Sequence, residues 1–86
     1  MPQNRSMKKR LRQLHKRTAR NRGYRSRMRT AVRAAREAGK AQSDDLQARL
    51  IEAQRAIDKA AKVGAIHHRN AARSKSRLMK ELNARA

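Results

Sequence analysis

Apolar side chains recur at helical spacing in three separate stretches of the chain. The clearest stretch lies in the middle, where apolar residues stand three or four positions apart: Leu46, Leu50, Ala53, Ile57 and Ala60. This spacing places them on one face of a helix, which we predict over about residues 44–63. Because this face is apolar, the helix must pack against a neighbouring element.

The predicted middle helix has residues at both ends that favour its start and stop. Ser43 is the expected N-cap, with Asp44 and Asp45 in the first turn, where the helix dipole favours anions. Lys62 lies near the end of the helix, where the dipole favours cations, and Gly64 suits the position just after it.

Two pairs on this helix place an acid four residues before a base, namely Asp45 with Arg49 and Asp58 with Lys62. Such residues are neighbours on a helix surface, and each pair contributes about 0.2–0.5 kcal/mol. Both pairs are therefore expected to support the middle helix.

The first stretch predicts a long helix over about residues 6–38, since Met7, Leu11 and Leu14 share a face with apolar residues further on. Near Gly23 the apolar face is interrupted by polar residues, and a glycine inside a helix costs about 1 kcal/mol relative to alanine. We therefore expect the N-terminal half of this helix to project beyond the rest of the fold. Gly39 is expected to begin the turn that follows.

The last stretch predicts a shorter helix over about residues 67–84, with Ala71, Lys75, Leu78 and Leu82 on one face. No run rich in β-branched residues is flanked by turn residues, so strands are not expected. Three helices with short connections favour an all-α fold, an antiparallel three-helix bundle with a long, basic, projecting first helix. Residues 1–86 are expected to form a single domain.

Charge divides the chain into the same three parts. The whole chain carries 25 Lys and Arg against six Asp and Glu, a formal charge of +19. Residues 1–36 contribute +14, residues 37–65 are neutral, and residues 66–86 contribute +5. The neutral middle therefore predicts a scaffold helix between two basic helices that bind a polyanion.

Composition narrows the class of protein further. The large aliphatic residues number only six Leu, three Ile and two Val, and 16 residues are Ala, so any core is thin. This composition falls in the range of chains that fold poorly alone. There is no cysteine, no apolar run long enough to span a bilayer and no secretory h-region. We expect a soluble intracellular protein that is not an enzyme.

Arginine outnumbers lysine 17 to eight, which suits phosphate recognition because a planar guanidinium binds two oxygens at once, although high genomic G+C content gives the same ratio. With Tyr24 as the only aromatic side chain apart from the histidines, base stacking on aromatic platforms is not expected. Folded or double-helical RNA is the favoured partner.

Several other interpretations fit the residues less well. A membrane-surface helix or a transit peptide leaves the neutral middle helix unexplained. His67 and His68 are adjacent and point to different sides of a helix, so no metal site is expected. Ser74, Ser76 and Thr30 have no neighbouring base and orienting acid arranged as a triad, which argues against nucleophilic catalysis. The methionines, Met7, Met28 and Met79, are interpreted as core residues.

The starts of the two basic helices carry cations where the helix dipole favours anions. Lys8, Lys9 and Arg10 fall in the first turn of the predicted first helix, and His67, His68 and Arg69 in that of the third. One hypothesis is that external phosphates bind these helix starts. The alternative is that water solvates them.

Residues 57–61, 64–67 and 70–78 form the most specific set of motifs, and a basic first helix begins with Ser6 and Lys8. These motifs resemble the bacterial small-subunit ribosomal protein S-twenty family, and the resemblance covers the whole chain. Two departures are the opening residues 1–4 and His68, where a lysine is common in the family.

The resemblance implies a three-helix bundle that binds 16S ribosomal RNA directly, early in assembly of the small (30S) subunit. It thereby implies a cytoplasmic location in the ribosome, with other small-subunit components as further candidate partners. RNA contacts carried over from matching positions are Lys8, Lys9, Arg10, Arg17, Asn21, Arg29, His67, Asn70, Arg73, Lys75 and Arg77. Charge alone adds Arg12, Lys16, Arg22 and Arg25.

We expect no cofactor, no membrane partner and no homo-oligomer. The alternative to the ribosomal interpretation is a nonspecific, histone-like protein that compacts duplex DNA, since the same charge would serve that role. Competition between 16S RNA and random duplex DNA distinguishes the two.

Overall fold

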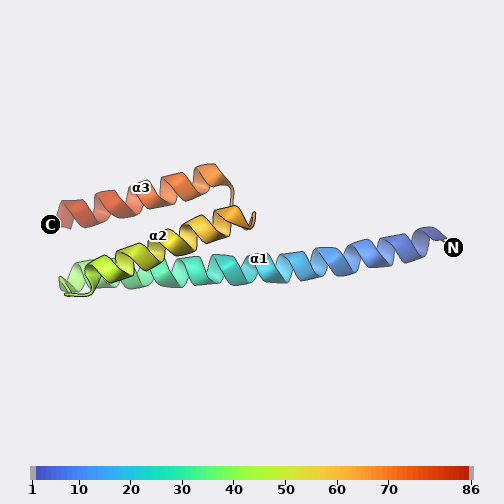
Figure 1. Cartoon of the computed structure of the whole chain (residues 1–86), viewed down its shortest axis with the longest axis horizontal. Helices are drawn as coiled ribbons and strands as arrows, with labels where there is room; N and C mark the ends of the chain where they lie inside the picture. The colour runs from blue at the N-terminus through green and yellow to red at the C-terminus, as the bar shows by residue number, and fades with distance from the viewer. Residues whose placement is uncertain (1, 86) are drawn as a thin grey trace.

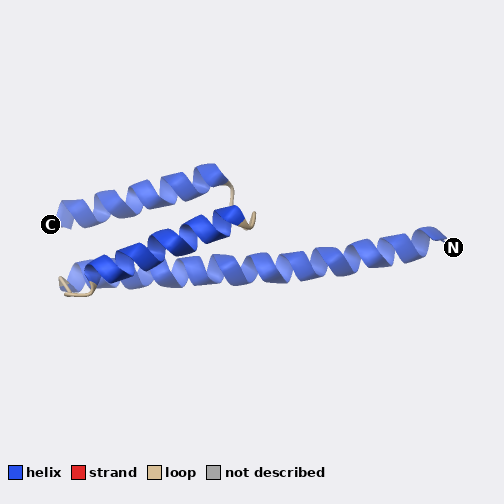
Figure 2. Ribbon diagram, viewed as in Figure 1, coloured by secondary structure: helices blue, strands red, loops and turns tan. Residues whose placement is uncertain are grey.

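The fold consists of helices joined by short turns. The computed structural model describes residues 2–85, which form three helices, α1 (Pro2–Ala41), α2 (Leu46–Lys62) and α3 (His68–Arg85), and no strand (Figures 1 and 2). Consecutive helices run in opposite directions, so α1 and α3 run in the same direction. The predicted all-α bundle is confirmed, with helices close to the expected ranges of 6–38, 44–63 and 67–84.

The first helix is much longer than the bundle that it belongs to. Its 40 residues span about 60 Å at 1.5 Å per residue, which accounts for the 63 Å long axis of the molecule. The radius of gyration is 17.4 Å, whereas a compact chain of this length has about 12 Å. Residues 5–20 are exposed and extend away from α2 and α3, as the sequence predicts (Figure 1).

The core lies between the C-terminal half of α1 and the other two helices. Its centre is formed by buried Ala35, Ala53, Leu78 and Leu82, against which Val32 and Leu46 are partly buried. The apolar face predicted for α2 is confirmed, since Ala53, Ile57 and Ala60 are fully buried. Among the residues whose burial is described, only Ile57 and Leu78 are large and fully buried, so the core is as thin as the composition indicates.

The prediction that a turn begins at Gly39 was wrong, because α1 continues to Ala41. Gly39 is a buried helical residue, and a Cβ there would lie 2.5 Å from a Leu82 methyl carbon. Glycine therefore lets α3 approach the backbone of α1. The helix ends at Ala41. It is followed by Gln42, whose φ of 51° is left-handed, and the Ser43 N–H donates to the Ala38 carbonyl at 2.9 Å.

The start of α2 also differs from the prediction. Asp45 occupies the N-cap position, and Ser43 and Asp44 precede it, so no acidic residue lies in the first turn. The Ser43 hydroxyl bonds the Asp45 carboxylate instead of capping a backbone N–H. The sequence located the cap two residues too early because Ser43 and Asp44 are both favourable N-cap residues.

The end of α2 is formed as predicted by Gly64, whose φ is +80°. The Ala65 N–H donates to the Ala60 carbonyl at 2.8 Å, and the Gly64 N–H donates to the Ala61 carbonyl at 3.1 Å. These two bonds form a Schellman motif, which satisfies carbonyls that a helix end otherwise leaves without a partner.

Two ion pairs tie α3 to the other helices. Arg36 of α1 lies 2.8 Å from Glu81, and Asp58 of α2 lies 2.8 Å from Lys75. The predicted pair of Asp45 with Arg49 is present at 3.2 Å. The prediction for Asp58 was wrong, because its carboxylate contacts Lys75 of α3 instead of Lys62 on its own helix.

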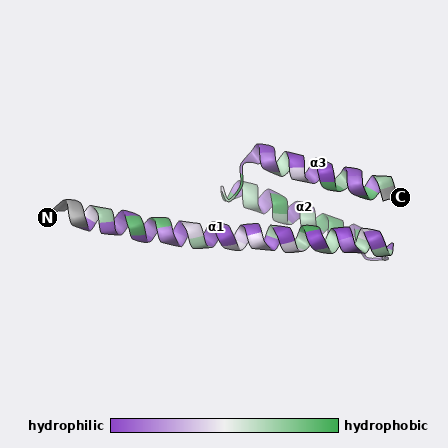
Figure 3. Ribbon diagram, turned by 180° about the vertical axis from the view of Figure 1, so that it is seen from behind, coloured by the Kyte–Doolittle hydropathy of each residue, from purple (hydrophilic) through white to green (hydrophobic). Residues whose placement is uncertain are grey.

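Not every apolar residue enters the core. Met7, Leu11 and Leu14 lie on the projecting part of α1 and are more than half exposed. Figure 3 shows hydrophobic positions, in green, on this part of the helix. Met79 is exposed on α3 and its sulfur accepts a hydrogen bond from the Gln54 amide at 3.6 Å. The interpretation of Met7 and Met79 as core residues was therefore wrong.

Candidate nucleic-acid interface

The projecting part of α1 presents its cations mainly on one side. On an ideal helix each residue turns by about 100°, which places most of them opposite the exposed stripe of Met7, Leu11 and Leu14. None of these cations has an acidic neighbour on this part of the helix, since residues 2–36 contain no Asp or Glu. The predicted RNA contacts in this group are exposed: Lys8, Lys9, Arg10, Arg12, Lys16 and Arg17.

The predicted contacts Asn21, Arg22 and Arg25 lie where α1 leaves the bundle. Asn21 is half-buried, and its Oδ1 has no hydrogen-bond partner among the described residues. Arg22 and Arg25 are exposed. The guanidinium of Arg27 lies 5.3 Å from the centre of the Tyr24 ring, so a cation already covers one face of the only tyrosine.

The start of α3 is capped by its own histidine. The Nδ1 atom of His67 accepts a hydrogen bond from the Arg69 N–H at 3.1 Å, and its carbonyl accepts from Ala71 at 3.1 Å. The rings of His67 and His68 lie 4.1 Å apart. His67 therefore holds one of the N–H groups that a helix start leaves free.

These observations weaken the hypothesis that phosphates bind both helix starts. The structure has α1 beginning at Pro2, so the prediction that Lys8, Lys9 and Arg10 occupy its first turn was wrong. At α3, His67 precedes the helix and bonds one N–H, while His68 and Arg69 do lie in the first turn.

The predicted contacts on α3 fall on two sides of the helix. Asn70, Arg73 and Arg77 are exposed and lie within about 60° of one another on an ideal helix. Lys75 lies on another side, half-buried, in its ion pair with Asp58. Lys75 thus has a structural contact, which Asn70, Arg73 and Arg77 lack among the described residues.

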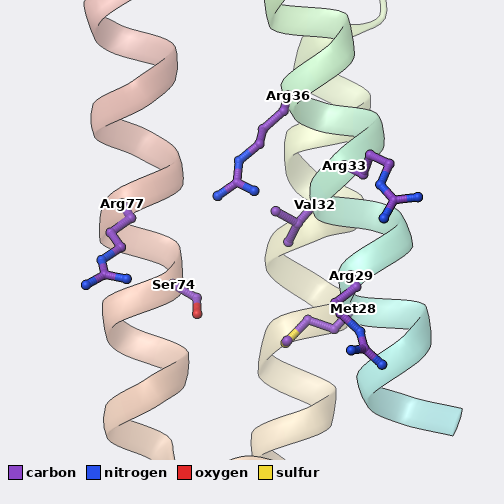
Figure 4. Close-up of a pocket in the computed structure, with 7 residues that line it drawn as sticks. All are labelled: Met28, Arg29, Val32, Arg33, Arg36, Ser74 and Arg77. Carbon is purple, nitrogen blue, oxygen red and sulfur yellow. The ribbon is translucent and has the colours of Figure 1, made fainter. Parts of the chain in front are cut away.

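A trough between α1 and α3 gathers several arginines (Figure 4). It has a volume of about 370 Å³, and we call it the α1–α3 trough. In Figure 4, Met28, Val32 and Arg36 extend from α1 toward α3, and Ser74 extends from α3 toward α1. The trough is lined by Met28, Arg29, Val32, Arg33, Arg36, Ser74 and Arg77.

Arg29 and Arg77 were predicted from the sequence as RNA contacts, whereas Arg33, Arg36 and Ser74 were not. A signal for Arg33 and Arg36 was present, because the arginines of α1 repeat at steps of three and four residues. These residues form one arginine row along the helix: Arg22, Arg25, Arg29, Arg33 and Arg36. Ser74 could not be found in this way, because its position depends on how α3 packs.

One carboxylate close to these helices has a shifted pKa. Hydrogen bonds from the Ser43 hydroxyl and the Arg49 guanidinium hold the pKa of the Asp45 carboxyl below its ordinary value of 3.8. This carboxyl belongs to the turn before α2 and stabilises that turn through its bonds with Ser43 and Arg49.

The described part of the chain, residues 2–85, holds neither a cluster of metal ligands nor a membrane-spanning helix. The described His, Cys, Asp and Glu side chains form no group of three or more that would hold a metal ion. None of the described helices has an apolar stretch of the length that crosses a membrane.

The fold and the interface define a class, a small all-helical protein whose first and third helices carry arginine-rich surfaces. Within this class, the family model described as Ribosomal protein S20 matches residues 2–83 of the chain. The chain therefore belongs to this family.

Curated relatives agree over nearly the full chain, and each is named small ribosomal subunit protein bS20. The chain is 46% identical to the relative from Thermomicrobium roseum, over 98% of this chain and 86% of the relative. It is 45% identical to that from Gemmatimonas aurantiaca, over 100% of this chain and 99% of the relative. It is 40% identical to the relative from Listeria monocytogenes serotype 4a, over 95% of this chain and 98% of the relative.

Proposed function

We propose that this chain is a structural component of the small ribosomal subunit. In this role it binds 16S ribosomal RNA directly through the basic α1 and α3, and it stabilises the folding of that RNA during assembly. Membership of the Ribosomal protein S20 family carries the proposal, because relatives that match almost the whole chain are named as proteins of that subunit.

The distribution of charge supports an RNA partner for α1 and α3. These helices carry the excess of +14 and +5, while the middle part that contains α2 is neutral and contributes most of its acids to ion pairs. The exposed cations of α1 extend over a length that no contact within the chain covers. Phosphates would neutralise these cations and remove their mutual repulsion.

Competition binding tests this function. Labelled 16S RNA is bound to the full chain at about 0.3 M salt, where nonspecific binding is weak. Either unlabelled 16S RNA or random duplex DNA is then added. We expect 16S RNA to compete far better than the DNA. Equal competition would support the DNA-compacting alternative and reject the ribosomal function.

The salt dependence of the same binding counts the phosphate contacts. For duplex nucleic acid the slope of log affinity against log salt is about −0.9 for each neutralised phosphate, so ten contacts give about −9. A slope near −2 would show that most of the predicted side chains do not contact phosphate.

A further inference from the structure

We propose that the α1–α3 trough binds the phosphate backbone of a single RNA strand, which lies between its two arginine-bearing edges. This inference rests on the proposed function but goes further, because it assigns a continuous strand to one defined surface. It also adds Arg33 and Ser74, which neither charge along the sequence nor the resemblance selected.

Most of the positive charge around the trough has no acidic partner among the described residues. Four guanidinium groups line the trough, and among the described residues only Arg36 has an acidic partner, Glu81 at 2.8 Å. Arg29, Arg33 and Arg77 therefore leave a local charge of about +3 beside one small volume. In Figure 4 the guanidinium groups of Arg29 and Arg33 point away from α3 and that of Arg77 points away from α1, so they stand on the outer rims of the trough, where they can reach the phosphates of a bound strand.

The arrangement of the arginines fits an extended anion better than a single ion. Arg29, Arg33 and Arg36 stand at steps of four and three along α1, so they share one side of the helix over about two turns, or about 10 Å. Arg77 comes from the opposite edge, on α3 (Figure 4). Its lining residues extend over Met28 to Arg36 on α1 and Ser74 to Arg77 on α3, so a chain of phosphates can follow the two helices.

The rest of the lining favours contact with the backbone of RNA over contact with bases. Met28 and Val32 supply apolar surface, and Ser74 supplies a hydroxyl that can donate to a phosphate oxygen. No aromatic side chain lines the trough, so it offers no platform on which a base would stack. We therefore expect the trough to bind RNA with little dependence on base sequence.

The ion pair between Arg36 and Glu81 joins the two helices that flank the trough. It lies one turn beyond Arg33 and Arg77 and, with the packing of Leu82 against Gly39, holds the two edges together before RNA binds. Arginine side chains that already stand in the bound arrangement lose less conformational entropy on binding an anion than mobile ones do. Glu81 thus acts as a positioning residue and does not itself contact the phosphates.

The test is a triple variant, Arg29→Gln, Arg33→Gln and Arg77→Gln, bound to a 16S RNA fragment over a range of salt. Glutamine has a helix propensity close to that of arginine, so the helices are retained. We expect affinity to fall at least about tenfold and the salt slope to become shallower by about one for each residue, hence by about three. The corresponding Arg→Lys triple variant should keep most of the slope, because it keeps the charge.

The matched control removes cations from α2 instead. The double variant Arg55→Gln and Lys59→Gln changes two exposed residues that lie outside the trough and in no ion pair of the described residues. We expect it to leave the slope nearly unchanged. Circular dichroism of all variants verifies that they are folded to the same degree.

Two results would overturn the inference. If the folded Gln triple variant binds RNA with the slope of the wild type, the trough holds no phosphates, and 16S binding by the wild type would leave the proposed function intact. If it loses no more affinity per charge than the α2 control, the effect is one of net charge and not of the trough. Failure of the wild type to prefer 16S RNA would instead reject the proposed function.

Discussion

Two helix ends in this protein require a left-handed residue, and different residues supply it. After α1 the residue is Gln42, with φ of 51°, and after α2 it is Gly64, with φ of +80°. A residue with a Cβ pays about 1–2 kcal/mol for this conformation, whereas glycine adopts it freely. The two turns therefore differ in stability although their hydrogen bonds are alike.

We predict opposite effects from exchanging these residue types. Gln42→Gly should raise the free energy of unfolding by about 0.5–1 kcal/mol, since it removes the steric cost. Gly64→Ala should lower it by about 1 kcal/mol, although a Cβ at this position meets no atom within 4 Å. Urea unfolding of both variants measures the effects. If both variants change stability in the same direction, the left-handed conformation is not the cause.

The lowered pKa of Asp45 makes one contribution to stability depend on pH. A carboxyl whose pKa is lower in the folded state stabilises that state above its unfolded pKa, and this contribution is lost as pH falls through the folded value. We expect wild type to be more stable than Asp45→Asn at about pH 6, and the difference to diminish toward about pH 2.5. Thermal unfolding at both pH values measures it, and a difference independent of pH would contradict the role of the charge.

The roles of Gly64, Gly39 and Asp58 differ in how far they could be predicted from the sequence. Gly64 was found because its role depends only on its immediate neighbours. Gly39 was misjudged because its reason for being glycine is Leu82, more than forty residues away. The partner of Asp58 was missed for the same reason, since Lys75 belongs to another helix.

At the scale of helices, packing depends on very few large side chains. The spacing of apolar residues predicted the buried face of α2, because a single face of one helix can be seen in the sequence. It did not predict the trough, because that surface belongs to two helices whose relative placement depends on Arg36, Glu81 and the close approach at Gly39. The projecting stripe of Met7 and Leu11 resembles a core face in sequence, although the other helices do not reach it.

We predict that Leu78→Ala will severely destabilise the bundle, while Met79→Ala will not. Leu78 is fully buried in the core, and truncating such a leucine costs about 2–5 kcal/mol. Met79, the next residue, is 36% exposed, and its truncation should cost about 1 kcal/mol or less. Thermal unfolding followed by circular dichroism compares the two. Similar losses would indicate that the core is not organised around Leu78.

At the scale of the whole molecule, α1 is supported along only part of its length. Helix in the projecting part must form without packing, with Gly23 at its base and with like charges one turn apart, all of which oppose helix formation in water. In the proposed function, RNA phosphates neutralise these charges and so remove one of these penalties, which would couple folding to binding.

We expect the free chain to show partial helix by circular dichroism and to gain helix when a 16S fragment is added. The Gly23→Ala variant provides a control, because a Cβ at this position meets no other atom and alanine favours helix by about 1 kcal/mol. Its free form should be more helical, and its gain on binding smaller. Equal helicity of the wild type with and without RNA would reject coupled folding.

Because α1 is one uninterrupted helix, it also fixes the rotational phase between its two ends. Inserting a single residue between the projecting cations and the trough would turn one set by about 100° relative to the other while adding only about 1.5 Å. Inserting seven would add about 10 Å yet restore the phase to within about 20°. The helix thus determines both the distance between its two basic surfaces and the direction in which each surface presents its charge.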